Sequence, residues 1–394
     1  MSKLYLNKTQ LAAEVEKCLQ CPSKPCRQAC PVKCSPCDFI AAVKHGKGKQ
    51  AAELIAEQNP LGEVCGLICP DKFCVQACLR RHIDAPIRIP EVQAEIMRYA
   101  RENKLLSTLP EAAFNGKKIA VVGLGPGGIG AVVELLKNGF AVTAFEKSDS
   151  VGGALNLIPP MRLPREIIAA EWGFWAQNSR LEVRLNTTVE NYADLLQQGF
   201  AAVVMAVGEQ KLRTLGIAGE DLAVDYVAYL QNQQKYATTG NVAIIGGGAV
   251  AVDCARSAKE FGAANVEMFV RRRLSDMRVT AAERQALLES QVDITTMTRV
   301  TKIAKSADTL TAYTCKTRFN AEGRLEDVSQ SEIARGGFAQ IVLALGSTRA
   351  EELTEADNVF YAGDFAEGGS TVVEALASGK RVAAKIAEQM LSKK

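Results

Sequence analysis

Residues 118–128 read Lys118-Ile-Ala-Val-Val-Gly-Leu-Gly-Pro-Gly-Gly128, and this stretch decides the fold class. The apolar run predicts a buried strand, and the segment Ala131-Val-Val-Glu-Leu-Leu-Lys137 after the glycines predicts a helix. A further apolar run, Ala141-Val-Thr-Ala-Phe-Glu146, predicts a second strand. A strand, a helix and a strand in this order predict a βαβ unit, and therefore an α/β protein with a parallel sheet.

The glycines between this strand and this helix have the spacing G-x-G-x-x-G, with Gly123, Gly125 and Gly128 in the three glycine positions. The first permits a tight turn, the second lets the backbone approach a pyrophosphate, and the third allows close packing of helix on strand. Glu146 ends the second strand, where a carboxylate can bind both ribose hydroxyls and disfavours a 2′-phosphate. The unit therefore predicts a site for FAD or NAD(H).

The end of the chain decides between these two dinucleotides. A predicted strand runs from Asn358 to Tyr361, Gly363 and Asp364 follow it, and a helix is expected to begin near Thr371 and Val372. In oxidoreductases with two dinucleotide sites, such a Gly-Asp step forms the second half of a flavin site. We therefore predict FAD at the first site, with a plain surface turn as the alternative interpretation of the Gly-Asp step. We also count Gly153, after the first βαβ unit, as a cofactor-binding residue.

A second unit of the same kind is predicted from Asn241-Val-Ala-Ile-Ile245, a helix over Val252–Phe261 and a strand over Val266–Val270. Its motif is G-x-G-x-x-A, a common NADP variant. The positions are Gly246, Gly248 and Ala251.

Arginines, rather than an acid, follow the second strand of this unit: Arg271, Arg272 and Arg273, with Arg278 close behind. Guanidinium groups pair with a 2′-phosphate, where a carboxylate would repel it. We therefore predict NADPH at this site, with NADH and a plain solvated basic turn as alternatives.

Ten of the twelve cysteines lie in two blocks before the first βαβ unit. The first block holds Cys18, Cys21, Cys26, Cys30, Cys34 and Cys37, and the second holds Cys65, Cys69, Cys74 and Cys78. Both blocks contain the spacing C-x4-C-x3-C, and Cys30 and Cys69 each precede a proline. Such runs are typical of iron–sulfur clusters, each of which takes about four thiolates. Structural zinc and disulfides are the alternatives.

The composition describes a globular protein of two to three domains, with 394 residues, 47% hydrophobic and 23% charged. A net charge of +3 gives no reason to expect a nucleic-acid or membrane partner. No apolar run is long enough for a membrane span, and Met1–Tyr5 does not open a secretory signal. We expect a cytoplasmic protein, in which thiols stay reduced, and this disfavours disulfides.

The fold expected is α/β, with two Rossmann-like dinucleotide-binding domains preceded by a helical domain with two [4Fe–4S] clusters. The helical spacing of Ala52, Leu54, Ile55 and Gln58, and a second helical run over Pro90–Tyr99, support the helical domain. The FAD domain is expected to be split by an inserted NAD(P)H domain. The predicted boundaries are 1–105 for the cluster domain, 116–225 and 338–394 for the FAD domain, and 226–337 for the NAD(P)H domain.

Disulfide reductases of this architecture need a cysteine pair against the flavin, and none is available here. The segment Val151–Pro160 after the first unit has no cysteine, and Cys254 and Cys315 stand singly, with Cys254 in an apolar helix that suits the core. The clusters therefore remain as the outlet for electrons from the flavin.

Together these motifs resemble the reductase portion shared by the glutamate synthase small subunit and the NAD(P)H-oxidising half of dihydropyrimidine dehydrogenase. The resemblance covers essentially the whole chain. Its motifs are Cys18-Leu-Gln-Cys21, Pro25-Cys26-Arg-Gln-Ala-Cys30-Pro31, Asn59-Pro-Leu-Gly62, Val64-Cys-Gly-Leu-Ile-Cys69-Pro70, Phe73-Cys74-Val-Gln-Ala-Cys78, Ala85-Pro-Ile-Arg-Ile89 and Ile158-Pro-Pro-Met-Arg162-Leu-Pro164. Asn59–Gly62 and Asp84–Ile87 look nearer to the dihydropyrimidine dehydrogenase branch.

The resemblance implies ligand sets that spacing alone does not. One cluster would be held by Cys18, Cys21, Cys26 and Cys78, and the other by Cys30, Cys69, Cys74 and Gln93. For FAD it adds Arg162, Val189, Thr371 and Val372, and for NADP it adds Arg271, Arg272, Arg278 and the strand end Ala344-Leu-Gly346.

This chain departs from the family pattern at three positions. Cys34 and Cys37 are not family ligands, and the alternatives for them are a different cluster arrangement or spare thiols. Ala249 stands where the family usually has an acid. Cys65 matches a family cysteine that is not a ligand.

The function expected is electron input: NAD(P)H is oxidised at FAD, and electrons pass through two [4Fe–4S] clusters to a partner. No residue of the chain is assigned a catalytic role. The reaction implied is reduction of uracil or thymine on a second, FMN-type dehydrogenase subunit in a hetero-oligomer. The alternatives are a glutamate synthase small subunit with its large subunit as partner, and a non-catalytic zinc- and dinucleotide-binding scaffold.

Overall fold

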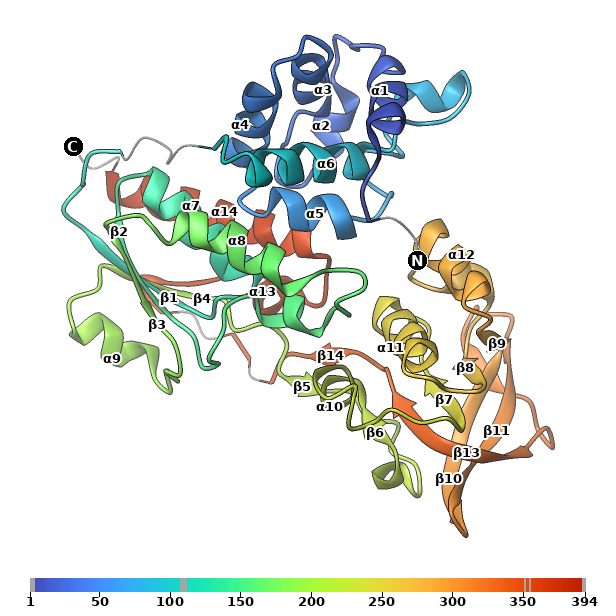
Figure 1. Cartoon of the computed structure of the whole chain (residues 1–394). Coiled ribbons are helices and arrows are strands. Elements are labelled where there is room, and N and C mark those ends of the chain that lie inside the picture. Colours follow the sequence, from blue (N-terminus) through green and yellow to red (C-terminus); the bar gives the residue numbers. More distant parts are fainter. Residues whose placement is uncertain (1–3, 107–111, 351, 354–355, 392–394) are drawn as a thin grey trace. The chain divides into compact units, whose positions relative to one another are not determined.

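The structure, a computed structural model, describes residues 4–106, 112–350, 352–353 and 356–391 (Figure 1). It divides into a first unit of Met1–Asn156, Pro160–Gln210 and Arg349–Lys394, and a second unit of Leu157–Pro159 and Lys211–Thr348. Residues 1–3, on which the expectation of no secretory signal partly rests, lie outside the described residues.

Helices connected by cysteine-bearing loops make up the start of the first unit (Figure 1). They are α1 (Lys8–Glu16), α2 (Pro25–Ala29), α3 (Pro36–Lys44), α4 (Gly48–Gln58), α5 (Gly62–Ile68), the 3-10 helix η1 (Leu79–His82) and α6 (Ile89–Glu102). Phe39, Ile55 and Val92 from α3, α4 and α6 are fully buried in one core. Cys78 belongs to this core, and Cys18 packs against it. The small helical domain expected from the sequence is therefore present.

A parallel five-stranded sheet forms the rest of the first unit, in the order β15-β4-β1-β2-β3. The strands are β1 (Lys118–Val122), β2 (Ala141–Phe145), β3 (Leu181–Arg184), β4 (Ala202–Met205) and β15 (Val359–Tyr361). The helices are α7 (Pro126–Lys137), α8 (Arg165–Trp175), α9 (Tyr192–Gln197), α13 (Asp364–Glu367) and α14 (Val372–Leu391), with the 3-10 helix η2 (Gly153–Leu157). Because β15 pairs with β4, the chain returns to this sheet after completing the second unit.

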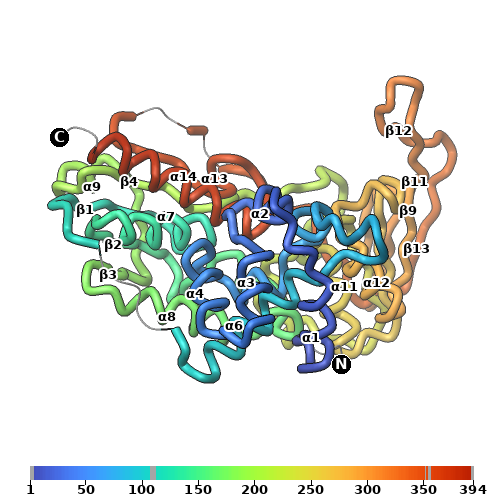
Figure 2. Tube along the Cα trace, turned by 90° about the horizontal axis from the view of Figure 1, so that it is seen from above, coloured from blue at the N-terminus to red at the C-terminus, as the bar shows by residue number. Residues whose placement is uncertain are grey.

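Helices α7 and α14 run side by side over one face of the sheet, and α9 lies on the other face (Figures 1 and 2). The apolar run of β1 explains this layering. Four of its five residues are buried, as expected for a strand whose sheet is covered by helices on both faces.

The second unit is built on an eight-stranded sheet whose main path is β10-β11-β13-β7-β8-β9, with β12 and β6 paired at its side. Its strands are β6 (Val224–Asp225), β7 (Asn241–Ile245), β8 (Val266–Val270), β9 (Asp293–Thr296), β10 (Thr298–Ser306), β11 (Thr309–Phe319), β12 (Leu325–Asp327) and β13 (Ile333–Leu343). A separate pair joins β5 (Lys211–Leu212) to β14 (Ser347–Thr348). The helices are η3 (Glu220–Leu222), α10 (Tyr226–Gln231), α11 (Ala249–Glu260), η4 (Leu274–Asp276) and α12 (Ala281–Glu289).

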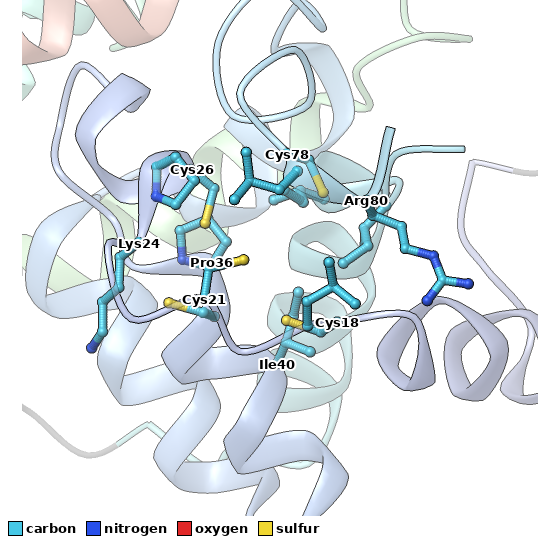
Figure 3. Close-up of a pocket in the computed structure, with 14 residues that line it drawn as sticks. Cys18, Cys21, Lys24, Cys26, Pro36, Ile40, Cys78 and Arg80 are labelled. Atoms are coloured by element: carbon cyan, nitrogen blue, oxygen red, sulfur yellow. The ribbon is translucent and has the colours of Figure 1, made fainter. Parts of the chain in front are cut away.

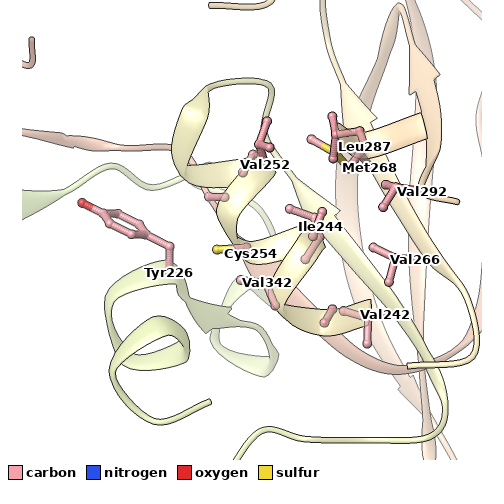
Figure 4. Packing of buried hydrophobic residues seen from close by; sticks show 14 of the residues in the cluster. Tyr226, Val242, Ile244, Val252, Cys254, Val266, Met268, Leu287, Val292 and Val342 are labelled. Carbon is pink, nitrogen blue, oxygen red and sulfur yellow. The ribbon is translucent and has the colours of Figure 1, made fainter. Parts of the chain in front are cut away.

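Cys254 lies on α11 in the apolar core of this unit (Figure 4). Its thiol is fully buried among residues that include Ile244 and Val342, and burial raises its pKa well above the usual value. The prediction that Cys254 belongs to the core is therefore confirmed.

The expected α/β class with two Rossmann-like halves is confirmed by these two sheets. The predicted domain boundaries stay a prediction, because the division into two units keeps the cluster domain and the flavin domain together. Strand β13 crosses the predicted boundary at 337/338 and pairs with β7 and β11 of the second unit. None of the helices within the described residues combines the length and apolarity that a membrane span requires.

Candidate functional site

The first glycine motif forms a turn that tolerates no larger residue at two of its positions. Gly123 has φ +95°, and a β-carbon there would lie 2.5 Å from the carbonyl oxygen of Ala206. A β-carbon on Gly128 would lie 1.8 Å from the carbonyl oxygen of Gly123. The backbone of α7 therefore packs directly on the end of β1, with the N-terminus of α7 opening at Pro126.

Bare backbone from three distant segments meets beside this turn. A β-carbon on Gly153 would lie 3.0 Å from Cα of Gly125, and one on Gly127 would lie 3.0 Å from Cα of Gly363. Gly125 itself has no atom nearer than 3.9 Å to an added β-carbon. This cradle, which any side chain would narrow, fits the close approach of a pyrophosphate at a helix N-terminus. The structure thus brings together the predicted flavin residues Gly123, Gly125, Gly128, Gly153 and Gly363.

Glu146 is buried directly behind the glycine turn. Its Oε2 accepts a hydrogen bond from the Leu124 amide at 2.7 Å, and its Oε1 accepts from the amide and hydroxyl of Ser148 at 3.0 and 2.6 Å. The carboxylate therefore holds the turn in place. Its predicted contact with ribose hydroxyls stays a prediction.

Asp364 and Thr371 shape the other wall of this site. The Ser370 hydroxyl donates to Asp364 at 2.5 Å, while burial raises the pKa of this carboxyl. Thr371 precedes α14, and its amide and hydroxyl donate to Glu374 at 3.0 and 2.7 Å. This cap defines the start of α14 at Val372, one of the predicted flavin residues.

The two flavin residues that only the resemblance supplied lie apart from the glycine turn in the sequence. Val189 packs against the apolar cluster that contains Val122, Phe145 and Val203. Arg162 lies between η2 and α8 and is half-buried.

The second glycine motif repeats the close approach of the first. A β-carbon on Gly246 would lie 2.2 Å from the carbonyl oxygen of Ala344, whose amide donates to Ile245 at 2.9 Å. Ala251 is fully buried, and Gly248 has open space around it. Gly248 also forms an isolated β-bridge with Arg278. The structure therefore brings the glycine turn, the strand end before Gly346 and Arg278 together.

Arg271 and Arg272 follow β8 with exposed side chains. Their carbonyl oxygens are used, since they accept from the Thr317 hydroxyl at 2.7 Å and the Met297 amide at 3.1 Å. Neither guanidinium forms an ion pair with an acidic side chain of the part of the chain described here. Arg273 differs, because its guanidinium lies 4.6 Å from the ring centroid of Phe319.

One cysteine pocket gathers residues from both blocks. Cys18, Cys21, Cys26 and Cys78 line it, and their side chains lie around one space (Figure 3). The Gln20 side-chain amide donates to the Cys18 sulfur at 3.2 Å. Burial raises the pKa of Cys18, and it raises the pKa of Cys26 to about 12. Such thiols ionise when iron compensates their charge, which fits a cluster site.

A second pocket gathers Cys30, Cys69, Cys74 and Gln93. The Gln93 Nε2 donates to the carbonyl oxygen of Gly62 at 2.7 Å, which leaves Oε1 as the atom able to bind a metal. A hydrogen bond from the Cys34 thiol and backbone amides at 32–34 lower the pKa of Cys30 to about 7.

The two ligand sets implied by the resemblance thus line two separate pockets, although their cysteines alternate between the blocks. Their roles as ligands stay a prediction. No group of three or more His, Cys, Asp or Glu side chains among the described residues is arranged to hold a single metal ion. A [4Fe–4S] cluster spreads its ligands over four irons, so they need not converge on one point.

Three more cysteines, for which the sequence predicts no role as ligands, also line the pockets. Cys37 lines the first pocket, whereas Cys34 and Cys65 line the second. Pro36 lines both, so the segment from Cys34 to Cys37 passes from one pocket to the other. The spacing of the cysteines in the sequence indicated that they lie near the clusters, but it does not predict which pocket each sulfur faces.

Two lysines from the flavin domain cap a helix of the cluster domain, and sequence reasoning missed them. The Lys380 ammonium donates to the Gln58 carbonyl at 2.6 Å, and Lys137 donates to the Glu57 carbonyl at the same end of α4. Cations at a helix C-terminus satisfy its free carbonyls and complement its dipole.

Glu171 on α8 acts at the other end of the neighbouring helix. Its carboxyl accepts from the amides of Glu63 and Val64 at 2.6 and 3.0 Å, and so caps the N-terminus of α5. These long-range contacts hold the cysteine loops against the flavin domain.

The Lys137→Met substitution is expected to change how stability depends on pH. Burial lowers the pKa of Lys137 from 10.5 to about 8, so between these pH values the unfolded chain binds more protons than the folded chain. This group therefore makes the free energy of unfolding rise with pH across that interval. Denaturant unfolding of both proteins at pH 8, 9 and 10 measures the difference. We expect the free energy of unfolding to rise more with pH in the wild type than in the variant. Equal dependence on pH in the two proteins would contradict this.

Comparison with known proteins places both halves of the chain. The family described as dihydropyrimidine dehydrogenase domain II, 4Fe-4S cluster, matches residues 2–105, and the pyridine nucleotide-disulphide oxidoreductase family matches residues 117–379. The NAD-dependent dihydropyrimidine dehydrogenase subunit PreT of Escherichia coli is 31% identical over 95% of this chain and 92% of its own length.

More distant similarity extends to two other proteins. The glutamate synthase [NADPH] small chain of Escherichia coli is 28% identical over 67% of this chain and 60% of its own length. The structure of Mycobacterium tuberculosis FprA in complex with NADPH covers 70% of this chain and 85% of its own, at TM-score 0.60 and 16% identity, and shares the fold.

These matches confirm the expected oxidoreductase class and the set of FAD, [4Fe–4S] and NAD(P)H, and they leave the scaffold alternative without support. The chain belongs to the PreT and glutamate synthase small-chain family of NAD(P)H-dependent FAD/iron–sulfur electron-transfer proteins.

Proposed function

We propose that this chain supplies electrons from NADPH to a second subunit that reduces uracil or thymine to the 5,6-dihydropyrimidine. One observation carries the electron-transfer part: Val373 lines the second cysteine pocket and directly follows Val372, the start of α14 at the predicted flavin site. The flavin site and the cluster site therefore share one helix start. The match to the dihydropyrimidine dehydrogenase subunit over nearly the full length of both chains supports the substrate class.

The chain contributes binding and positioning rather than acid–base chemistry. When bound, FAD converts the two-electron chemistry of the nicotinamide into one-electron steps that iron–sulfur clusters can carry. The cradle of Gly125, Gly127, Gly153 and Gly363 would hold the pyrophosphate of FAD. The predicted cysteine ligands of the two pockets, all half-buried except the buried Cys78, would hold the clusters.

The partner proposed is an FMN-type dehydrogenase subunit in a hetero-oligomer. We propose a cytoplasmic complex, because thiol ligands suit a reducing compartment. A glutamate synthase large subunit is the second candidate, favoured by the similarity to the small chain. We rank it lower because that similarity covers two thirds of this chain, against 95% for the dihydropyrimidine dehydrogenase subunit.

An anaerobic titration of the full chain with NADPH tests the electron-transfer proposal. We expect the flavin absorbance to bleach and cluster signals to appear in the EPR spectrum. A flavin that stays oxidised, or clusters that remain EPR-silent throughout, would refute it. Adding uracil with the co-purified partner distinguishes the substrates, since glutamate synthesis needs glutamine and 2-oxoglutarate instead.

Replacing Arg271 and Arg272 together by alanine is expected to weaken NADPH binding while leaving NADH binding unchanged. Hydrogen bonds between charged groups contribute about 1.5–3 kcal/mol, which corresponds to a rise in KM for NADPH of roughly 10- to 100-fold. Steady-state kinetics with both coenzymes measure this. Arg273→Ala is the matched control, because its guanidinium contacts Phe319. If the ratio of the KM for NADPH to the KM for NADH is the same in the double variant as in the wild type, the arginines do not bind a 2′-phosphate.

A further inference from the structure

The first cysteine pocket, unlike the second, opens on exposed apolar side chains. Leu19 and Leu79 line it and are 44% and 42% exposed, and Ile83, at the end of the same short helix as Leu79, is 64% exposed. Every residue that lines the second pocket is buried or half-buried. Single exposed apolar residues are ordinary, but three beside one redox site form a patch.

Exposed arginines border this patch. The other basic side chains around it include four that are ion-paired: Lys17 with Glu14, Lys24 with Asp38, Arg80 with Asp84 and Arg88 with Glu91. Arg27 and Arg81 are exposed, and neither has an ion-pair partner among the described acidic side chains.

We propose that this rim, formed by Leu19, Leu79 and Ile83 with Arg27 and Arg81, docks the acidic face of a one-electron acceptor protein. An apolar centre within a charged border is the anatomy of a protein interface, and arginine is enriched there. Opposite charge steers the encounter and fixes its orientation. The proposal rests on the proposed function, because it makes the first pocket the exit for electrons.

The test uses two haem proteins as probes with the full, cofactor-loaded chain and NADPH. The soluble domain of cytochrome b5 is acidic, and cytochrome c is basic. At low salt we expect faster reduction of cytochrome b5, and its rate should fall as salt is added. Ile83→Glu and Arg81→Glu, made singly, should each slow the reduction of cytochrome b5 by about tenfold. Neither side chain lines the pocket.

Leu185→Glu is the control, because Leu185 is 37% exposed and follows β3 of the flavin sheet. We expect it to reduce cytochrome b5 at the wild-type rate. Faster reduction of cytochrome c by the wild type, or an equal effect of all three substitutions, would overturn the docking proposal. If the docking proposal fails in this way while NADPH still reduces flavin and clusters in every variant, the proposed function remains intact. If NADPH reduces neither in the wild type, the proposed function itself is wrong and the docking proposal falls with it.

Discussion

Replacing Cys78 by serine is expected to remove one cluster and to leave the other, which is the largest effect on electron transfer that we predict. Cys78 belongs to the second cysteine block, yet it lines the first pocket with Cys18, Cys21 and Cys26. Thiolates are the usual cluster ligands, and a cluster site that keeps only three of its four ligands is unstable. Iron content should therefore fall by about half, while NADPH still reduces the flavin.

The comparison that decides this prediction uses Cys74→Ser, from the same block. Cys74 lines the second pocket, so its loss should remove the other set of EPR signals. Cys65→Ser is the control, because Cys65 is buried in the second pocket without being a predicted ligand, and both clusters should survive. If Cys78→Ser and Cys74→Ser abolish the same signals, the alternation of ligands between the blocks is wrong.

The second large effect is expected for Gly128→Ala, which should yield protein without FAD and with reduced stability. The added β-carbon would lie 1.8 Å from the carbonyl oxygen of Gly123, a backbone atom that cannot move aside as the end of a flexible side chain could. The turn and the start of α7 must shift, which opens the cradle. We expect a loss of about 4 kcal/mol or more in the free energy of unfolding, together with the loss of bound flavin.

Gly173→Ala provides the matched control, since Gly173 lies within α8 with nothing within 4 Å of an added β-carbon. Alanine is favoured over glycine in a helix by roughly 0.5–1 kcal/mol, so this variant should be slightly more stable and should keep its flavin. Flavin content from the absorbance spectrum and chemical unfolding measure both variants. A flavin-replete, stable Gly128→Ala protein would contradict the packing role of this glycine.

Much of the fold could be predicted because its signals are local. The apolar run before Gly123 became β1, and the strand expected at Asn241 became β7 with the same first residue. The helix expected to start near Thr371 became α14, because Thr371 and Glu374 cap it. The helix expected from Val252 begins instead at Ala249, since the glycine turn leads directly into α11.

Residues that act through long-range packing could not be predicted in this way. Lys380 and Gln58 are far apart in sequence, and nothing near either residue indicates that a lysine caps α4. The role of Glu171 could not be predicted either. A glutamate in a helix is ordinarily exposed, whereas this one is buried against the amides of α5.

The sequence by itself determined the two dinucleotide turns, because glycine spacing between a strand and a helix constrains the backbone over a few residues. It also determined that the cysteines suit clusters, although the division into two ligand sets needed a family resemblance. Only the tertiary structure decided which sulfurs share a pocket, placing Cys34 in the second and Cys37 in the first. The reason is physical: the helices between the two blocks must first pack around their common core, and that packing brings Cys78 to Cys18.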